Sequence, residues 1–192
     1  YHKNNPADNL HIPFDLDNEE NITVTIWDDT CQAQLISTEI DLWFSKVLGS
    51  ACRLVYMPDH SRREVDPKYA AQHELTSFSD GYPILIIGQA SLDDLNTRLQ
   101  TSVPMNRFRP NIVFTGGAPY AEDDMKSFRI NTINFSGVKL CARCMVTTID
   151  QDTAMTGKDP LRALSDYRMQ NNKVMFGQNL IHEGDGLIAF GD

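Results

Sequence analysis

Alternating and helical hydrophobic patterns divide this 192-residue chain into short elements. Ile22, Val24 and Ile26 alternate with threonines, which predicts a half-buried strand over 22–26. Similar signals predict further strands at 31–36, 52–57, 83–87, 111–115, 145–149 and 187–190, with two more in 128–140 that meet at a turn near Ser136-Gly137. Segment 58–82 lacks a clear period and is read as a long irregular segment, a feature that often serves function.

Helical spacing occurs in three places. Apolar residues from Ile40 to Leu48 form one stripe, with Ser37 or Thr38 as the N-cap and Gly49 as the stop signal. Ser91 and Asp94 have the form of a capping box for a helix over 91–99. Asp159-Pro160 begins a third helix that runs to Tyr167. Because the helices do not alternate regularly with strands, we expect an α+β fold around a barrel-like sheet.

Composition narrows the function classes. The formal net charge is −9 and basic residues do not cluster, so nucleic acid is not an expected partner. No apolar run approaches the ~18 residues of a membrane-spanning helix, so no membrane partner is expected. Four cysteines in a chain this long are too few for a disulfide scaffold, which favours a cytoplasmic location.

The sharpest local motif is Cys141-Ala142-Arg143-Cys144. It is compatible with a zinc half-site, although no second ligand pair is found, and with a thioredoxin-like pair, although a strand is expected to follow it. Two inert core cysteines are a third interpretation. The fourth is a single thiolate that binds a soft, redox-active metal, with Arg143 favouring the charged sulfur.

Three other runs contain side chains suited to a ligand. Arg107, Arg109 and Asn111 flank a proline before a strand, where arginine forks suit phosphate and amides suit a pterin edge. Gln178 and Asn179 follow a glycine in what reads as a turn. Thr147 follows the cysteine motif, in a position where threonines are usually structural.

Five collinear runs resemble the MOSC-domain proteins, in particular the amidoxime-reducing components and the bacterial reductases of N-hydroxylated bases. The runs are NRFRPNIVFTG (106–116), CARCMVTTID (141–150), FSDGYPILIIGQASLDDLNTRL (78–99), DPLRALSDYR (159–168) and FGQNLI (176–181). The resemblance covers roughly residues 20–192. It implies a β-barrel-centred MOSC domain with flanking helices, expected at 37–192, and a remnant of an N-terminal β domain at 1–36.

The resemblance also implies a molybdenum–molybdopterin cofactor with Cys144 as the metal ligand. Arg109 and Asn111 occupy the family's cofactor-contacting positions. The remaining expected cofactor-binding residues are Arg107, Asp80, Gly81, Tyr82, Arg143, Thr147, Gln178 and Asn179. The family's lysine–serine motif for the cofactor phosphate is not found, so we expect this chain to bind the cofactor weakly or to lack it.

The implied activity is reduction of small N-hydroxylated substrates from N–OH to N–H. None of the four cysteines has ferredoxin spacing, so electrons are expected from a donor protein or a fused ferredoxin-type domain. The alternative function is a sulfur-carrier or cofactor-binding MOSC module without reductase activity, as found at the end of the enzymes that sulfurate the cofactor.

Overall fold

A computed structural model describes residues 2, 5–14, 20–70 and 72–192. By compactness the chain divides into two units, Tyr1–Arg63 and Glu64–Asp192. The predicted boundary between residues 36 and 37 concerned family domains and stays a prediction.

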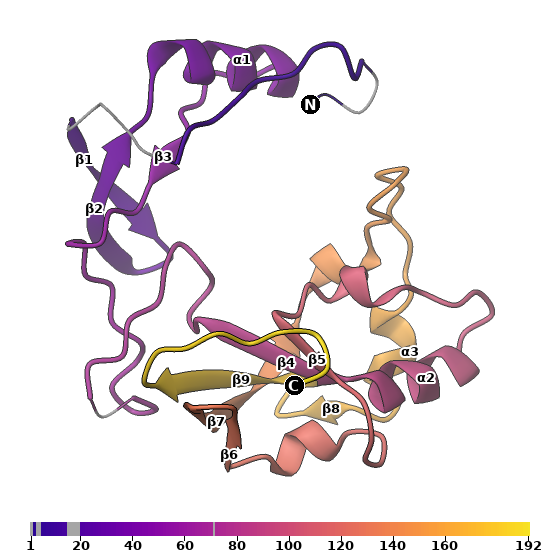
Figure 1. The fold of residues 1–192 in the computed structure, drawn as a ribbon. Coiled ribbons are helices and arrows are strands. Elements are labelled where there is room, and N and C mark those ends of the chain that lie inside the picture. The colour runs from indigo at the N-terminus through magenta and orange to yellow at the C-terminus, as the bar shows by residue number, and fades with distance from the viewer. Residues whose placement is uncertain (1, 3–4, 15–19, 71) are drawn as a thin grey trace. The chain divides into compact units, whose positions relative to one another are not determined.

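The first unit contains a three-stranded antiparallel sheet and one helix (Figure 1). Its elements are β1 (Asn21–Ile26), β2 (Asp29–Leu35), α1 (Thr38–Leu48) and β3 (Val55–Tyr56). The predicted caps of α1 are confirmed, because the Ser37 hydroxyl accepts the Ile40 N–H and Gly49 adopts a left-handed φ of 66°. The strand predicted at 52–57 is shorter than expected, since only two of its residues pair with β2.

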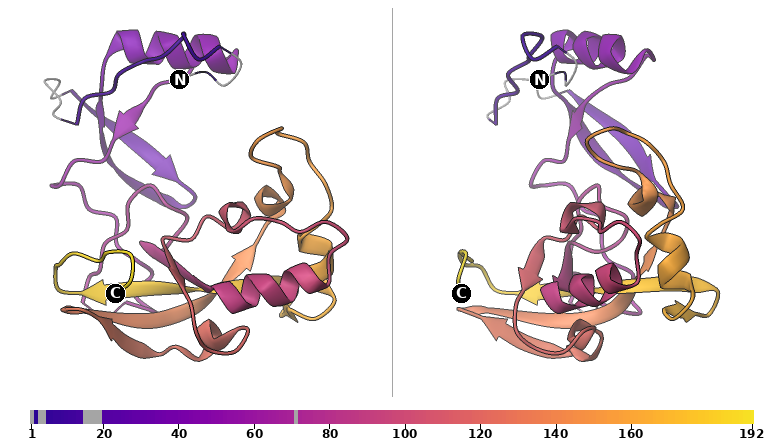
Figure 2. Two further views of the ribbon diagram at one scale, coloured as in Figure 1. Left: turned by 45° about the vertical axis from the view of Figure 1, so that its right-hand side comes forward. Right: turned by 90° about the vertical axis from the view of Figure 1, so that its right-hand side faces the viewer.

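The second unit is organised around a strongly curled half-barrel sheet in the order β5-β4-β9-β7-β6 (Figure 2). β4 and β5 are parallel, the other pairs are antiparallel, and β8 adds to β9. The strands are β4 (Ile84–Gly88), β5 (Ile112–Phe114), β6 (Ser127–Ile130), β7 (Ile133–Arg143), β8 (Met169–Gln170) and β9 (Lys173–Glu183). The helices are α2 (Gln89–Thr97), α3 (Leu161–Ser165) and the 3-10 turns η1 (Met105–Arg107), η2 (Ala121–Asp124) and η3 (Met145–Thr148). The predicted α+β class is confirmed.

Two apolar cores lie on opposite faces of this sheet. Ile87 of β4 and Phe176 of β9 pack with Leu95 of α2 and Leu164 of α3. The second core is built mainly from strand residues, including Ile86, Leu180 and Phe135, as expected inside a curled sheet. Neighbouring residues of β4 therefore face different cores, which follows from the alternation of side chains along a strand.

Several local predictions are wrong. Segment 187–190 forms no strand, and its Leu187 and Phe190 are exposed. The turn expected near Ser136-Gly137 lies instead between Ile130 and Ile133. Glycine is needed at position 137 because a side chain there would collide with the Met125 carbonyl of the neighbouring chain segment.

Side-chain hydrogen bonds account for two further corrections. The strand predicted at 145–149 is the 3-10 helix η3, because the hydroxyls of Thr147 and Thr148 bond back to the carbonyls of Cys144 and Met145 at 3.0 and 2.7 Å. Ser91 does not cap α2. Its hydroxyl is buried and donates to Glu122 at 2.8 Å, while the N-cap residue is Gly88.

The largest difference between the predicted and the observed elements is β9. The sequence predicts a turn at the FGQN run, yet the run lies inside an eleven-residue strand. Gly177 takes a left-handed φ of 86°, and a Cβ there would lie 2.8 Å from Cγ1 of Ile87. Its role is therefore close packing of β9 against β4.

Candidate functional site

Cys144 lies at the point where β7 ends and η3 begins. It is the N-cap of η3, with extended backbone angles of −119° and −177°, and it is exposed. Its carbonyl accepts both the backbone N–H and the hydroxyl of Thr147. Its sulfur makes no hydrogen bond with any residue that the structure describes. The thiol is thus held on a fixed backbone while its sulfur remains available.

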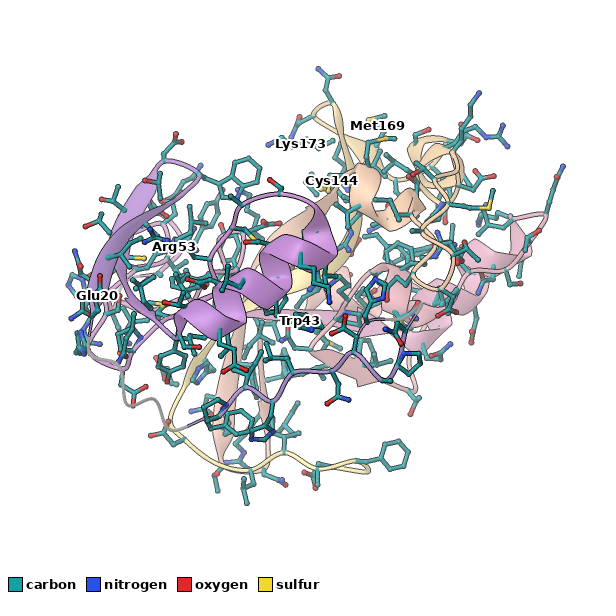
Figure 3. All side chains as sticks on the ribbon, turned by 90° about the horizontal axis from the view of Figure 1, so that it is seen from above. Glu20, Trp43, Arg53, Cys144, Met169 and Lys173 are labelled. Carbon is teal, nitrogen blue, oxygen red and sulfur yellow. The ribbon has the colours of Figure 1, made fainter. Side chains whose placement is uncertain are left out.

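Strand register identifies the neighbours of Cys144 across the sheet. Arg143 pairs with Val174 of β9, and Val174 pairs with Met169 of β8. Figure 3 accordingly shows Cys144 beside Lys173 and Met169. Lys173 is exposed and forms no ion pair with a described residue. By register Lys173, whose charge is unpaired among the described residues, is thus the residue opposite Cys144, on a strand that sequence analysis did not predict.

Cys141 has a different environment from Cys144. It lies within β7, is half-buried, and its sulfur accepts a hydrogen bond from Nη1 of Arg143 at 2.9 Å. Three extended residues span about 10 Å, which is too far for a disulfide between the two cysteines. Both are free. The sequence disfavours a thioredoxin-like pair because it predicts a strand directly after the motif. A 3-10 helix follows instead, but the spacing along an extended strand disfavours that pair equally.

The run 106–111 and the run 141–150, far apart in sequence, are tied together by hydrogen bonds. Nη2 of Arg107 contacts Asp150 at 2.7 Å, and its Nη1 donates to the Thr147 carbonyl at 3.4 Å. Nη2 of Arg143 donates to the Phe108 carbonyl at 2.6 Å. The structure thus brings together two of the predicted site segments, and Arg107 acts as an internal brace between them.

Asp150 is a site residue that the sequence reasoning missed, although it ends the quoted run CARCMVTTID. The backbone N–H and hydroxyl of Thr153 donate to it, and together with Arg107 they lower its pKa from the ordinary 3.8 to about 2. It therefore stays ionised at any neutral or mildly acidic pH. Its charge pairs with Arg107 within the fold.

Arg109 contrasts with Arg107. It is exposed, and it forms no hydrogen bond or ion pair within the described part of the chain. Its backbone is left-handed, with a φ of 53°, immediately before Pro110. An uncompensated guanidinium on a chain with net charge −9 is a ready contact for an anionic ligand.

Some of the polar atoms of Asn111 form hydrogen bonds within the fold. Its Oδ1 accepts the Leu85 N–H at 2.9 Å, and its own N–H donates to the Leu85 carbonyl at 2.9 Å. The side chain therefore extends the pairing between β4 and β5. The amide nitrogen keeps its donors, so a ligand contact through Nδ2 stays a prediction.

Gln178 and Asn179 point to opposite faces of β9. Gln178 pairs with Ile86, is 6% exposed, and its Oε1 has no partner among the described residues. Asn179 is half-buried, lies opposite Leu85 and Lys139, and makes no side-chain hydrogen bond with a described residue. A ligand surface on one face of the strand can therefore include only one of these two side chains, and Asn179 is the more exposed of them.

Segment 80–82 lies near Asn179 rather than near Cys144. Lys139, the strand neighbour of Asn179, has its Nζ 5.9 Å from the ring centre of Tyr82. Burial, followed by Tyr69 and Asp66, raises the pKa of Tyr82 to about 12, so its hydroxyl stays protonated. Asp80 is exposed and Gly81 is half-buried. Lys139 lies five strand positions before Cys144, about 16 Å along β7.

Two further kinds of feature are absent from the described residues. No three His, Cys, Asp or Glu side chains among them converge as a metal-binding group. None of the described helices is both long and apolar enough to cross a bilayer.

Comparison with known proteins adds an independent line of evidence. The family model described as "MOSC domain" matches residues 74–192, more than half of the chain. "Mitochondrial amidoxime-reducing component 1" of Mus musculus is 35% identical over 164 residues, covering 78% of this chain and 48% of that protein. The protein of the same name from Homo sapiens matches to the same extent. "Molybdenum cofactor sulfurase" of Oryza sativa is 30% identical over 178 residues, covering 83% of this chain and 22% of that protein. The chain thus spans about half the length of the amidoxime-reducing relatives.

Proposed function

Because this chain belongs to the MOSC domain family, we propose that it binds a molybdenum–molybdopterin cofactor through Cys144 and reduces N-hydroxylated compounds. The relatives that match with 35% identity are named for amidoxime reduction. An amidoxime contains an N–OH group, so its reduction is the N–OH to N–H conversion inferred from the sequence. Electrons would come from a donor protein or from a fused ferredoxin-type domain.

The proposal rests on the free thiol of the exposed Cys144, which lies in a segment hydrogen-bonded to the run 106–111. A soft thiolate on rigid backbone suits molybdenum, which prefers sulfur ligands. Arg109 supplies an unpaired cation for the anionic phosphate of the pterin. Amide donors of Asn111 and Asn179 suit the polar edge of a pterin ring. The donor set therefore fits the group.

The protein residues have separate tasks in this proposal. Molybdenum, when bound, supplies the two-electron change that the reduction requires. Cys144 fixes the metal and is a permanent ligand rather than a nucleophile. Thr147, 2% exposed, bonds the Cys144 carbonyl and so fixes the ligand's backbone. Arg107 and Arg143 keep the two segments at a constant separation.

A paired substitution tests the metal ligand. The chain is produced in cells that make the cofactor, and bound molybdenum is measured by mass spectrometry. We expect measurable but substoichiometric molybdenum in the unaltered chain, loss of that molybdenum in Cys144→Ser, and its retention in Cys141→Ser. Molybdenum that remains in Cys144→Ser would refute the assignment. Retained molybdenum without turnover of benzamidoxime by the chemically reduced protein would reject the reductase activity and leave the cofactor site.

A second candidate function is a sulfur carrier. The 30% identity to a molybdenum cofactor sulfurase favours it, as does the accessible thiol of Cys144. In that case Cys144 would carry a persulfide. Intact-protein mass spectrometry would then show one added sulfur atom that dithiothreitol removes, in a protein free of molybdenum. Cys144→Ser would abolish that addition and Cys141→Ser would not.

A further inference from the structure

The backbone of Arg109 has an unfavourable conformation. A left-handed φ of 53° is disfavoured for any residue with a side chain. A residue before proline is normally extended, so Pro110 makes this conformation still less favourable. Such a residue persists only where its surroundings impose the conformation, and such positions cluster at functional sites.

Both neighbours of Arg109 are fixed. On one side, the Phe108 ring is fully buried 4.3 Å from the ring of Phe176, and its carbonyl accepts the Arg143 guanidinium at 2.6 Å. On the other side, Asn111 makes two hydrogen bonds to the backbone of Leu85. Only Arg109 and Pro110 connect these two anchored residues, which restricts the backbone conformations that Arg109 can adopt.

Arg143 is itself oriented by Cys141. Its Nη1 donates to Sγ of Cys141 at 2.9 Å, and its guanidinium carbon lies 5.4 Å from the Phe108 ring centre. Among the described residues its buried Nε has no hydrogen-bond partner, and no carboxylate pairs with its guanidinium. The Cys141 sulfur is therefore one of its two acceptors, which gives this cysteine a task beyond filling space.

We propose that Arg143, oriented by Cys141, is a positioning residue that holds Arg109 in its left-handed conformation, so that the Arg109 guanidinium is directed away from the protein toward an anionic ligand. This inference rests on the proposed function, in which that anion is the phosphate of the molybdopterin. In this arrangement Cys141 orients Arg143, and Cys144 binds the metal. Cys141 and Arg143 need not touch the cofactor.

A stability cycle in the cofactor-free chain tests the positioning. Glycine adopts left-handed angles without penalty, so Arg109→Gly should raise the Tm by about 2–4 °C. In an Arg143→Met background the same substitution should give a clearly smaller increase, because one of the contacts that impose the conformation has been removed. Ala154→Gly is the control. Ala154 also has a left-handed φ, of 58°, and no hydrogen bond joins it to Arg143, so its effect should be equal in both backgrounds.

Equal effects of Arg109→Gly in the two backgrounds would overturn the proposal, as would a lower Tm in the otherwise unchanged chain. This arm needs no cofactor, so it decides the positioning role even if the chain proves to bind no molybdenum. A chain that binds no molybdenum would reject the proposed function and leave the positioning role of Arg143 unaffected.

Cofactor retention tests the consequence. Pterin and molybdenum remaining after dialysis should fall about tenfold in Arg109→Met and similarly in Arg143→Met. The double variant should be no worse than Arg109→Met, since Arg143 acts through Arg109. Cys141→Ser, which keeps an acceptor, should retain the cofactor, and Cys141→Val should lose part of it. Additive losses in the double variant, or full retention in Arg143→Met, would overturn the inference.

Discussion

Two polar regions of the second unit differ in how their charges are used. The tyrosine cluster, made of Asp94, Arg98, Tyr120, Asp123, Tyr167 and Arg168, pairs each guanidinium with a carboxylate and stacks it over a ring. The Cys144 corner, made of residues 106–111, 141–150 and Lys173, leaves Arg109, Lys173 and the Cys144 sulfur without a described partner. The first region stabilises the fold, whereas the second keeps its groups available for a ligand.

The tyrosine cluster connects α2, η2 and the start of β8. The Tyr120 hydroxyl donates to Asp94 at 2.5 Å and contacts the Tyr167 hydroxyl at 2.8 Å. Burial, together with these hydrogen bonds, raises the pKa of Tyr120 far above its usual value, so it remains a neutral donor. Arg168 bonds both Asp123 and the Met175 carbonyl of β9. Changes here should therefore alter stability and spare ligand binding.

The largest stability effect is expected from Arg168→Met. The pair with Asp123 is 2.6 Å long, with side chains 11% and 19% exposed. Removing the cation leaves a largely buried carboxylate uncompensated, which should lower the free energy of unfolding by about 3 kcal/mol. Urea denaturation measures it. Arg162→Met is the matched control, because its pair with Asp159 is exposed and should contribute under about 0.5 kcal/mol. Similar losses in both variants would contradict the comparison.

Tyr120→Phe should have an intermediate effect. It removes one hydroxyl that joins Asp94 and Tyr167, while Arg98 still neutralises Asp94 at 3.0 Å. The expected loss is about 1 kcal/mol. Tyr56→Phe, at an exposed position, should change nothing measurable. Bound molybdenum should be unchanged in both variants, and its loss in Tyr120→Phe would show that the two regions are coupled.

A smaller, pH-dependent effect is expected at Asp150. Its folded pKa of about 2 lies below its ordinary 3.8, through hydrogen bonds from Thr153 and Arg107. The stabilising contribution is thus fully present above the unfolded pKa and is lost as the pH falls through the folded pKa, between about 4 and 2. The Tm of the parent chain should fall more steeply over this window than that of Asp150→Asn. Parallel curves would refute the assigned pKa.

The sequence predicted the element types best where one local signal dominated. The Ser37 cap, the Gly49 stop and the strand at 22–26 depend on neighbours along the chain, and the structure has them. Collinear motifs identified the MOSC family, which the family model confirms. They also selected the two segments that the hydrogen bonds of Arg107 and Arg143 bring together.

Features that depend on partners distant in sequence were missed. Gly177 looked like a turn residue, but packing against Ile87 makes it part of a long strand. Because β9 was missed, Lys173 could not be placed beside Cys144. Nothing local distinguishes Arg107 from Arg109. Only the fold shows that the first is paired with Asp150 and that the second is free.

The smallest stability effect is expected at the residue with the largest proposed functional effect. The Cys144 sulfur is exposed and bonds to no described residue, and its fixed backbone depends on its carbonyl, which serine retains. Cys144→Ser should therefore change the free energy of unfolding of the cofactor-free chain by less than about 0.5 kcal/mol. Thiol labelling of the native chain should find Cys144 reacting first and the buried Cys31 last. A marked destabilisation by Cys144→Ser, or a slow Cys144, would mean that this sulfur is packed into the fold. The contrast with the tyrosine cluster would then fail, because both regions would be structural.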